Sequence, residues 1–193
     1  MKQFLLPLAA VLILVAILLL GGAGPRGGDP REAVYLTVRR SDSIPDHARI
    51  LPNTTDQRLM EFTVTNSNAT TTYRLENFVF LYGPQNTHPD GYVKYIRAVD
   101  GAGTRMLELP ILASLSSSAS STPPYALPPL SSRMFRVHGN VYTSISTSTA
   151  LQIEISNISA ADAATGLYEQ VYEETSGQPL SASPMRSALF DVY

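Results

Sequence analysis

The segment LMEFTVT, residues 59–65, alternates apolar and polar side chains from its second residue onward, and this alternation decides the fold. Successive side chains of an extended chain point to opposite faces. One face therefore takes Met60, Phe62 and Val64, while Glu61 falls on the polar face. A period of two residues with one apolar face is typical of a β-strand that packs against a core on one side only.

The same pattern recurs along the chain after residue 24, where no segment has the clear periodicity of an amphipathic helix. Further strands are expected at 33–39, 73–82, 92–99, 106–112, 133–141, 151–156 and 187–193. Turn residues separate these runs, as in the His-Pro-Asp-Gly tetrapeptide at 88–91. The spacing predicts an all-β domain, an antiparallel immunoglobulin-like β-sandwich of about seven to nine strands. Residues 160–174 fit a short helix and a two-sided strand equally well.

The N-terminal segment FLLPLAAVLILVAILLL, residues 4–20, has no charge, hydroxyl or amide side chain. A helix of this length spans about 26 Å at about 1.5 Å per residue, and the uncharged residues 21–24 extend it to the thickness of a bilayer core. We therefore expect one hydrophobic signal-anchor or transmembrane helix over residues 1–23, with the lipid bilayer as the partner of residues 4–20. The small residues Gly21 and Ala23 also allow a cleaved signal, and the chain would then be secreted after cleavage near Ala23.

A Gly- and Pro-rich spacer is expected at residues 24–32, followed by a β-sandwich domain over residues 33–193. We expect the N-terminus inside and the domain on the extracytoplasmic side. Three acceptor sequons in the domain fit this side of the membrane and are possible glycosylation sites, namely Asn53, Asn68 and Asn157. Residues 113–132 are rich in Ser and Pro, which predicts a surface loop.

Composition argues against several function classes. The net charge is −2 without a basic stripe, so no nucleic-acid partner is expected. The chain has no cysteine, which excludes disulfides and thiolate chemistry. Its three histidines are far apart in sequence, and neither a zinc-binding nor a serine-hydrolase motif occurs. We therefore predict no catalytic residues, no cofactor and no metal site.

Two sets of residues are candidates for contacts with other molecules. Tyrosine combines a large contact area with a polar tip, and a possible contact patch is formed by Tyr82, Tyr92 and Tyr95 around the turn at 88–91. The alternating segment 33–39 follows the spacer and could pair with the open sheet edge of a neighbouring molecule. The core-facing residues of this possible donor strand are Val34, Leu36 and Val38.

Residues 127–156 resemble the closing half of immunoglobulin-like modules on bacterial surface proteins. In such modules a turn with Pro or Gly precedes a strand of alternating apolar residues that contains a Gly, and a second alternating strand follows. Here the two strands are formed by Phe135, Val137, Gly139 and Val141, and by Leu151, Ile153 and Ile155. The resemblance implies a scaffold or a binding module.

The sequence thus predicts a single-pass, membrane-anchored, extracytoplasmic β-sandwich with a structural or protein-binding role at the cell envelope and without catalysis. Its protein partner is not specified by the sequence. Two alternatives remain: a secreted or surface filament subunit that assembles by strand donation from residues 33–39, and a surface module that binds a glycan or calcium.

Overall fold

The computed structural model describes residues 34–193 except 89–91, 104, 112–116 and 143–148. The expected anchor at 1–23 and spacer at 24–32 therefore lie outside the described residues. Residues 34–193 form one compact unit, in which every regular element of the described part is a strand. No helix in these ranges is long and apolar enough to span a bilayer. The all-β prediction is confirmed.

Each segment expected to be extended contains a strand, and the ambiguous region 160–174 contains short strands rather than a helix. The strands are β1 (Leu36–Arg40), β2 (Ala48–Ile50), β3 (Thr54–Asn66), β4 (Tyr73–Tyr82), β5 (Val93–Asp100), β6 (Arg105–Ile111), β7 (Ser117–Leu127), β8 (Ser131–Val141), β9 (Thr149–Leu151), β10 (Ile153–Asp162), β11 (Tyr168–Glu169), β12 (Val171–Glu173), β13 (Met185–Arg186) and β14 (Phe190–Val192).

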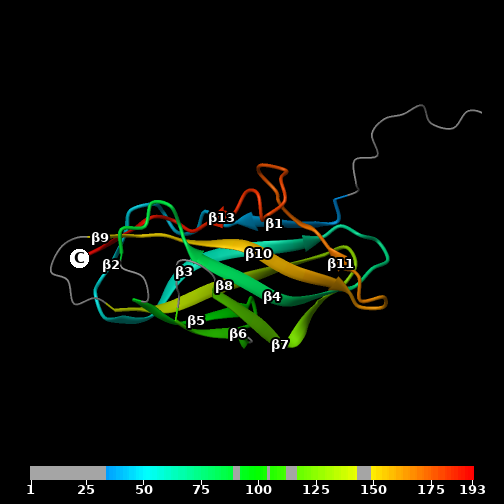
Figure 1. Ribbon diagram of the computed structural model, residues 1–193, viewed down its shortest axis with the longest axis horizontal. Coiled ribbons are helices and arrows are strands. Elements are labelled where there is room, and N and C mark those ends of the chain that lie inside the picture. Colours follow the sequence, from blue (N-terminus) through cyan, green and yellow to red (C-terminus); the bar gives the residue numbers. More distant parts are fainter. Residues whose placement is uncertain (1–33, 89–91, 104, 112–116, 143–148) are drawn as a thin grey trace, which may run out of the picture. The chain divides into compact units, whose positions relative to one another are not determined.

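The strands form two large sheets and one small sheet (Figure 1). The first sheet has the order β12-β1-β3-β8-β5-β6, and the second has the order β11-β10-β4-β7, with β13 also paired to β10. The small sheet, β2-β14-β9, contains the last strand of the chain. Figure 1 places β2, β9 and the C-terminus at one end of this unit and β11 at the other.

The two large sheets pack face to face around aromatic rings. The ring centroid of Phe78 in β4 lies 6.5 Å from that of Phe62 in β3 and 6.4 Å from that of Phe135 in β8. Tyr125 in β7 meets Phe135 edge to face, at 5.3 Å between centroids. The three phenylalanines are fully buried. In both sheets, alternate side chains along the strands point inward and fill one shared core. The unit is therefore a β-sandwich.

The expectation of a purely antiparallel sandwich was wrong at two places. β1 pairs with β12 in parallel, and β2 pairs with β14 in parallel. The cause is the path of the C-terminal segment: β11 pairs with β10 of the second sheet, β12 pairs with β1 of the first, and β13 returns to β10. This segment joins the two sheets along one side. Its short strands also raise the number of strands above the expected seven to nine.

The prediction of a surface loop at 113–132 was also wrong, because residues 117–127 form β7, which pairs with β4. β7 is an edge strand of the second sheet, so one side of its backbone has no neighbouring strand in that sheet. Proline is tolerated on such an edge because no ladder hydrogen bond is required from it. Pro123 and Pro124 are exposed, whereas Leu127 is fully buried.

Gly139 in β8 lies where side chains of both neighbouring strands cover the sheet. A Cβ atom at this position would come within 2.8 Å of Leu59 Cδ1 and 3.2 Å of Val93 Cγ1. Both side chains are fully buried and have little room to move. We expect Gly139→Ala to lower the free energy of unfolding by about 1–3 kcal/mol through overpacking, measured by urea denaturation.

Gly101 provides the matched control for this substitution. It lies in the β5–β6 turn, and a Cβ atom there would find nothing closer than 3.8 Å. Gly101→Ala should change the free energy of unfolding by less than about 0.5 kcal/mol. Equal losses in the two variants would mean that close packing is not the reason for glycine at position 139.

Candidate functional site

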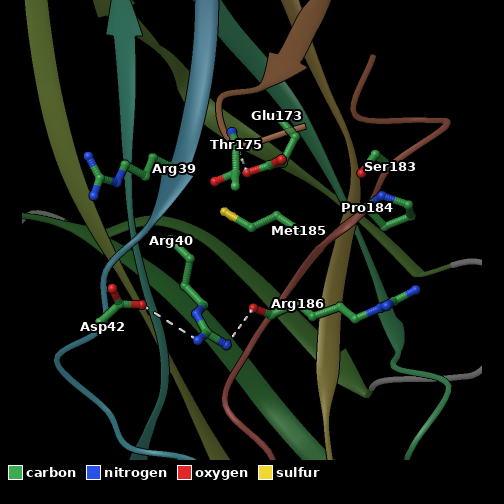
Figure 2. A pocket seen from close by; sticks show the side chains of 9 residues that line it. All are labelled: Arg39, Arg40, Asp42, Glu173, Thr175, Ser183, Pro184, Met185 and Arg186. Carbon is green, nitrogen blue, oxygen red and sulfur yellow. Dashed lines mark hydrogen bonds and ion pairs between the residues drawn. The ribbon is translucent and has the colours of Figure 1, made fainter. Parts of the chain in front are cut away.

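A cleft of about 500 Å³ opens where β1, β12 and β13 come together. β1 contributes Arg39 and Arg40 to its walls, and β13 contributes Met185 and Arg186 (Figure 2). Met185 is buried and lies near the centre of the view, between polar side chains that surround it. The cleft exists because the C-terminal segment crosses here from the first sheet to the second.

Arg40 holds the two sides of the cleft together. Its Nη1 donates to the backbone carbonyl oxygens of Ser187 at 3.1 Å and Arg186 at 3.5 Å, and its Nη2 lies 3.6 Å from Asp42 Oδ1. A guanidinium in this geometry fixes the end of β1 to the segment that follows β13. Its role here is structural.

The other charges around the cleft are largely paired as well. Arg39 Nη1 lies 3.7 Å from Glu174 Oε1, and Arg186 Nε lies 3.5 Å from Glu154 Oε2. Burial alone would raise the pKa of Glu173, but the backbone N–H groups of the next turn, at residues 175 and 176, donate to its carboxylate and lower that pKa. The charged side chains that line the cleft are therefore mostly paired with other side chains or with backbone groups, and the cleft carries no concentrated charge of one sign.

No reaction can be assigned to this cleft from its geometry. In the described ranges no group of three or more His, Asp or Glu side chains could hold a metal ion. The two described His–carboxylate contacts lie elsewhere: His47 Nδ1 is 3.2 Å from Asp191 Oδ1, and His138 Nδ1 is 3.2 Å from Asp56 Oδ1. Asp56 also accepts from Arg97 Nε at 3.1 Å, so this cluster is explained as a surface ion-pair network.

The structure separates the three tyrosines of the predicted contact patch. Tyr82 is buried at the end of β4, and its hydroxyl accepts the backbone N–H of Val93 at 3.1 Å. Tyr92 is half-buried, and its ring meets the imidazole of His88 edge to face. Only Tyr95 is exposed, at 55%. Tyr82 therefore supports the sandwich from inside and presents no exposed ring beside Tyr95.

The segment of the predicted donor strand packs into its own domain. Leu36 and Val38 are fully buried, whereas Val34 is 42% exposed. β1 pairs antiparallel with β3 and in parallel with β12, so it lies inside the first sheet rather than at its edge.

The three sequons lie in different surroundings, and their use stays a prediction. Asn53 is exposed in the turn before β3 and has φ 59°. Asn68 is half-buried, and its Oδ1 accepts the backbone N–H groups of Thr70 and Thr71. Asn157 lies at a bulge of β10 and lines a hollow of about 470 Å³ beside Tyr168.

Sequence reasoning missed a buried carboxylate near β1. The alternation of the sequence places Glu61 on the polar face of β3, and the side chain does point away from the core. However, Arg136 Nε donates to Glu61 Oε2 at 2.9 Å, Ser43 Oγ donates to Oε1 at 3.2 Å, and only 7% of the residue is exposed. Burial alone would raise the pKa of Glu61, but the hydrogen bonds from these two residues and from Ser41, together with the charge of Arg136, lower it.

We expect Glu61→Gln to destabilise the domain by about 1–3 kcal/mol at pH 7, because a charged hydrogen-bond network loses its acceptor. A lowered folded-state pKa contributes stability above the ordinary value of 4.5 and loses it as pH falls through the folded-state value. The variant should therefore show a shallower loss of stability below pH 4.5, measured by thermal unfolding across pH. Glu174→Gln, which removes the exposed partner of Arg39, should cost less than about 0.5 kcal/mol and leave the acid slope unchanged.

Comparison with known proteins gives structural likenesses only. No family model matches the sequence, and no curated protein matches it. Among solved structures, the chain resembles the major pilin subunit BcpA of Bacillus cereus with a TM-score of 0.37 and 9% identity, over 81% of this chain and 40% of that one. The chain thus spans less than half the length of that pilin.

Two further solved structures give similar values. One is AvmM, which catalyses macrocyclization in alchivemycin A biosynthesis, with a TM-score of 0.36 and 11% identity over 82% of this chain and 88% of that one. The other is self-complemented MyfA, the major subunit of Myf fimbriae from Yersinia enterocolitica, with a TM-score of 0.22 and 8% identity over 81% of this chain and 97% of that one. Likenesses of this size do not establish a shared family.

Proposed function

We propose that the protein is a membrane-anchored, extracytoplasmic β-sandwich with a structural or protein-binding role at the cell envelope and without catalytic activity. The observation that carries this proposal is the uninterrupted apolar run at 4–20, joined through a Gly- and Pro-rich stretch to an all-β unit that starts at Val34. A run of this length fits a bilayer core, and the unit beyond it has a complete hydrophobic core of its own.

The test is selective release of the domain from intact cells. A site for a specific protease is inserted within residues 24–32 of the full chain, and the enzyme is added outside the cells. Residues 34–193 should appear in the medium while the N-terminal fragment stays in the membrane fraction. Unmodified protein is the control and should stay bound. Protection of the inserted site in intact cells would place the domain on the other side of the membrane and contradict the proposal.

N-terminal sequencing separates anchored from secreted protein. A mature chain that starts at Met1 or Lys2 fits the anchor, whereas a start near Gly24 means that the hydrophobic segment is removed and the domain is released. Only the first outcome is compatible with a permanent tether.

A second candidate function is a filament subunit that donates its N-terminal strand. The position of β1 favours it: the strand precedes the rest of the domain and contributes two fully buried side chains. A neighbour's residues 33–39 could replace β1 between β3 and β12 by the same contacts. Folded full-length chain should then exchange β1 for a labelled peptide of residues 32–40 over time. If the peptide is never incorporated, strand donation has no support.

A further inference from the structure

Three turns meet at the end of the sandwich where β1 begins. They are residues 67–72, 128–130 and 163–167, and backbone hydrogen bonds connect them. Leu130 N donates to Asn68 O at 3.0 Å, Ala163 N donates to Thr72 O at 2.9 Å, and Ser67 N donates to Tyr35 O at 2.9 Å. We call this surface, together with Val34 and Tyr168, the entry end. It lies at the β11 side of Figure 1.

The entry end exposes apolar side chains, and its three turns carry no charged residue. Leu130, Leu167 and Tyr168 are each 71% exposed, and Val34 is 42% exposed. None of the three turns contains Lys, Arg, Asp or Glu. Two carboxylates border this surface. Asp162 accepts the backbone N–H groups of residues 164 and 165 at 2.7 and 3.1 Å. Glu76 Oε2 accepts the hydroxyl of Tyr168 at 3.1 Å, and Glu76 Oε1 lies 3.4 Å from Arg74 Nη2.

The backbone at Leu130 is unusual for an exposed apolar residue. Its φ is 48°, in the left-handed region that glycine and asparagine occupy more easily. The conformation belongs to the turn in which Leu130 N donates to Asn68 O, and the Leu130 side chain itself is 71% exposed. A large apolar side chain therefore occupies an exposed turn position that Gly or Asn would occupy with less strain.

The opposite end of the unit is charged. His47 lies against Asp191, Asp46 accepts the backbone N–H of Leu189, and the guanidinium of Arg49 lies 4.1 Å from the ring centroid of Tyr193. Exposed Leu51 lies in this charged environment with an exposed fraction of 60%. The apolar character of the entry end is therefore not a general property of the surface.

The number of residues between the apolar run and Val34 limits the distance between the proposed anchor and the entry end. Thirteen residues separate the apolar run from Val34 when counted from Gly21 to Ala33. Gly-rich chains of this length have an average end-to-end distance of about 20 Å. β3, with its 13 residues, is about 43 Å long. If residues 4–20 are held in a bilayer, the length of the tether allows the entry end to reach the membrane, whereas the charged end lies about the length of β3 farther away.

We propose that the entry end rests on the lipid bilayer that holds residues 4–20, with Leu130, Leu167 and Tyr168 in the interfacial region. Tyrosine and exposed leucine side chains on turns without charged residues suit that region. This inference rests on the proposed anchor. A second copy of the chain is the other molecule that could cover the same surface, and the experiment distinguishes it from lipid.

The lack of cysteine allows single-site labelling of the full chain. Leu130→Cys, Leu167→Cys and Tyr168→Cys place probes on the entry end, and Leu51→Cys is the control on the charged end. Each variant carries an environment-sensitive fluorophore and is inserted into phosphatidylcholine vesicles at low protein density. We expect entry-end probes to be quenched by spin-labelled lipid and to show several-fold weaker quenching by aqueous iodide than the probe at position 51.

Each other outcome overturns the inference in a distinguishable way. Equal iodide quenching at all four positions in chain that floats with the vesicles would mean that the anchor is present but the domain stands off the lipid. Entry-end protection that grows with protein density, without quenching by spin-labelled lipid, would assign the surface to a second copy. Chain that fails to float with vesicles would contradict the proposed anchor itself, and with it the contact of the entry end with lipid.

Discussion

A chain that begins at Ser41, and therefore lacks β1, is expected to show no cooperative unfolding transition. Leu36 and Val38 are fully buried, and each such side chain contributes about 1.5–3 kcal/mol. β1 also pairs with five residues of β3 and with three residues of β12, and the hydrogen bonds of both ladders would be lost. The sum is comparable to the total stability of a domain, about 5–15 kcal/mol. Circular dichroism and urea titration measure the loss.

A peptide of residues 32–40 should restore the transition in proportion to its concentration, because it binds only the folded chain. The same peptide with Leu36→Asp and Val38→Asp should not restore it, since the carboxylates would be buried in the core. A truncated chain that unfolds cooperatively and stays monomeric would show that β1 is dispensable. That result would also remove the basis for strand donation as a function.

The strands that the sequence predicted best are those that bury one face against the core. β4 occupies residues 73–82 as expected, and β3 and β8 contain the expected runs with short extensions. The periodicity nevertheless contains a break that explains the burial of Tyr82. The buried residues of β4 change from odd to even positions between Leu75 and Phe78, where the register with β7 shifts. Tyr82 has the same parity as Phe78, which would have placed it in the core.

Elements that bury little were not predictable from side chains. β7 consists mainly of small residues and is defined by main-chain pairing with β4. β2, β11, β12 and β13 have two or three residues each, too few for any period to emerge. The parallel pairing of β1 with β12 follows from the path of the C-terminal segment between the sheets, and no local pattern encodes that path.

The candidate cleft and the Glu61 network depend on contacts between distant parts of the chain. Arg40 and Ser187 are 147 residues apart, and Glu61 and Arg136 are 75 residues apart. The sequence shows an Arg pair at the end of an alternating run and one acid within an apolar strand. Which partner each of these charges takes is decided by the strand order β12-β1-β3-β8. Tertiary pairing of this kind is inaccessible to reasoning on spacing alone.

Phe62→Ala is expected to cause the largest loss of stability of any single substitution considered, about 3–5 kcal/mol. Phe62 is fully buried, and its ring centroid lies 5.4 Å from that of Phe135 in its own sheet and 6.5 Å from that of Phe78 in the opposite sheet. Truncation removes the ring that connects both layers and leaves a cavity that two rigid sheets cannot close. The urea midpoint should fall while the slope of the transition stays the same, which indicates lost stability without a change in the surface exposed on unfolding.

Tyr95→Ala removes a ring of similar size from the outside and is the matched control. Tyr95 is 55% exposed, so the free energy of unfolding should change by no more than about 0.5 kcal/mol. The difference between the two changes in the free energy of unfolding shows whether packing between the sheets or a surface aromatic patch stabilises this domain. A loss at Tyr95 as large as that at Phe62 would mean that the ring contacts across the sandwich are not what holds the two sheets together.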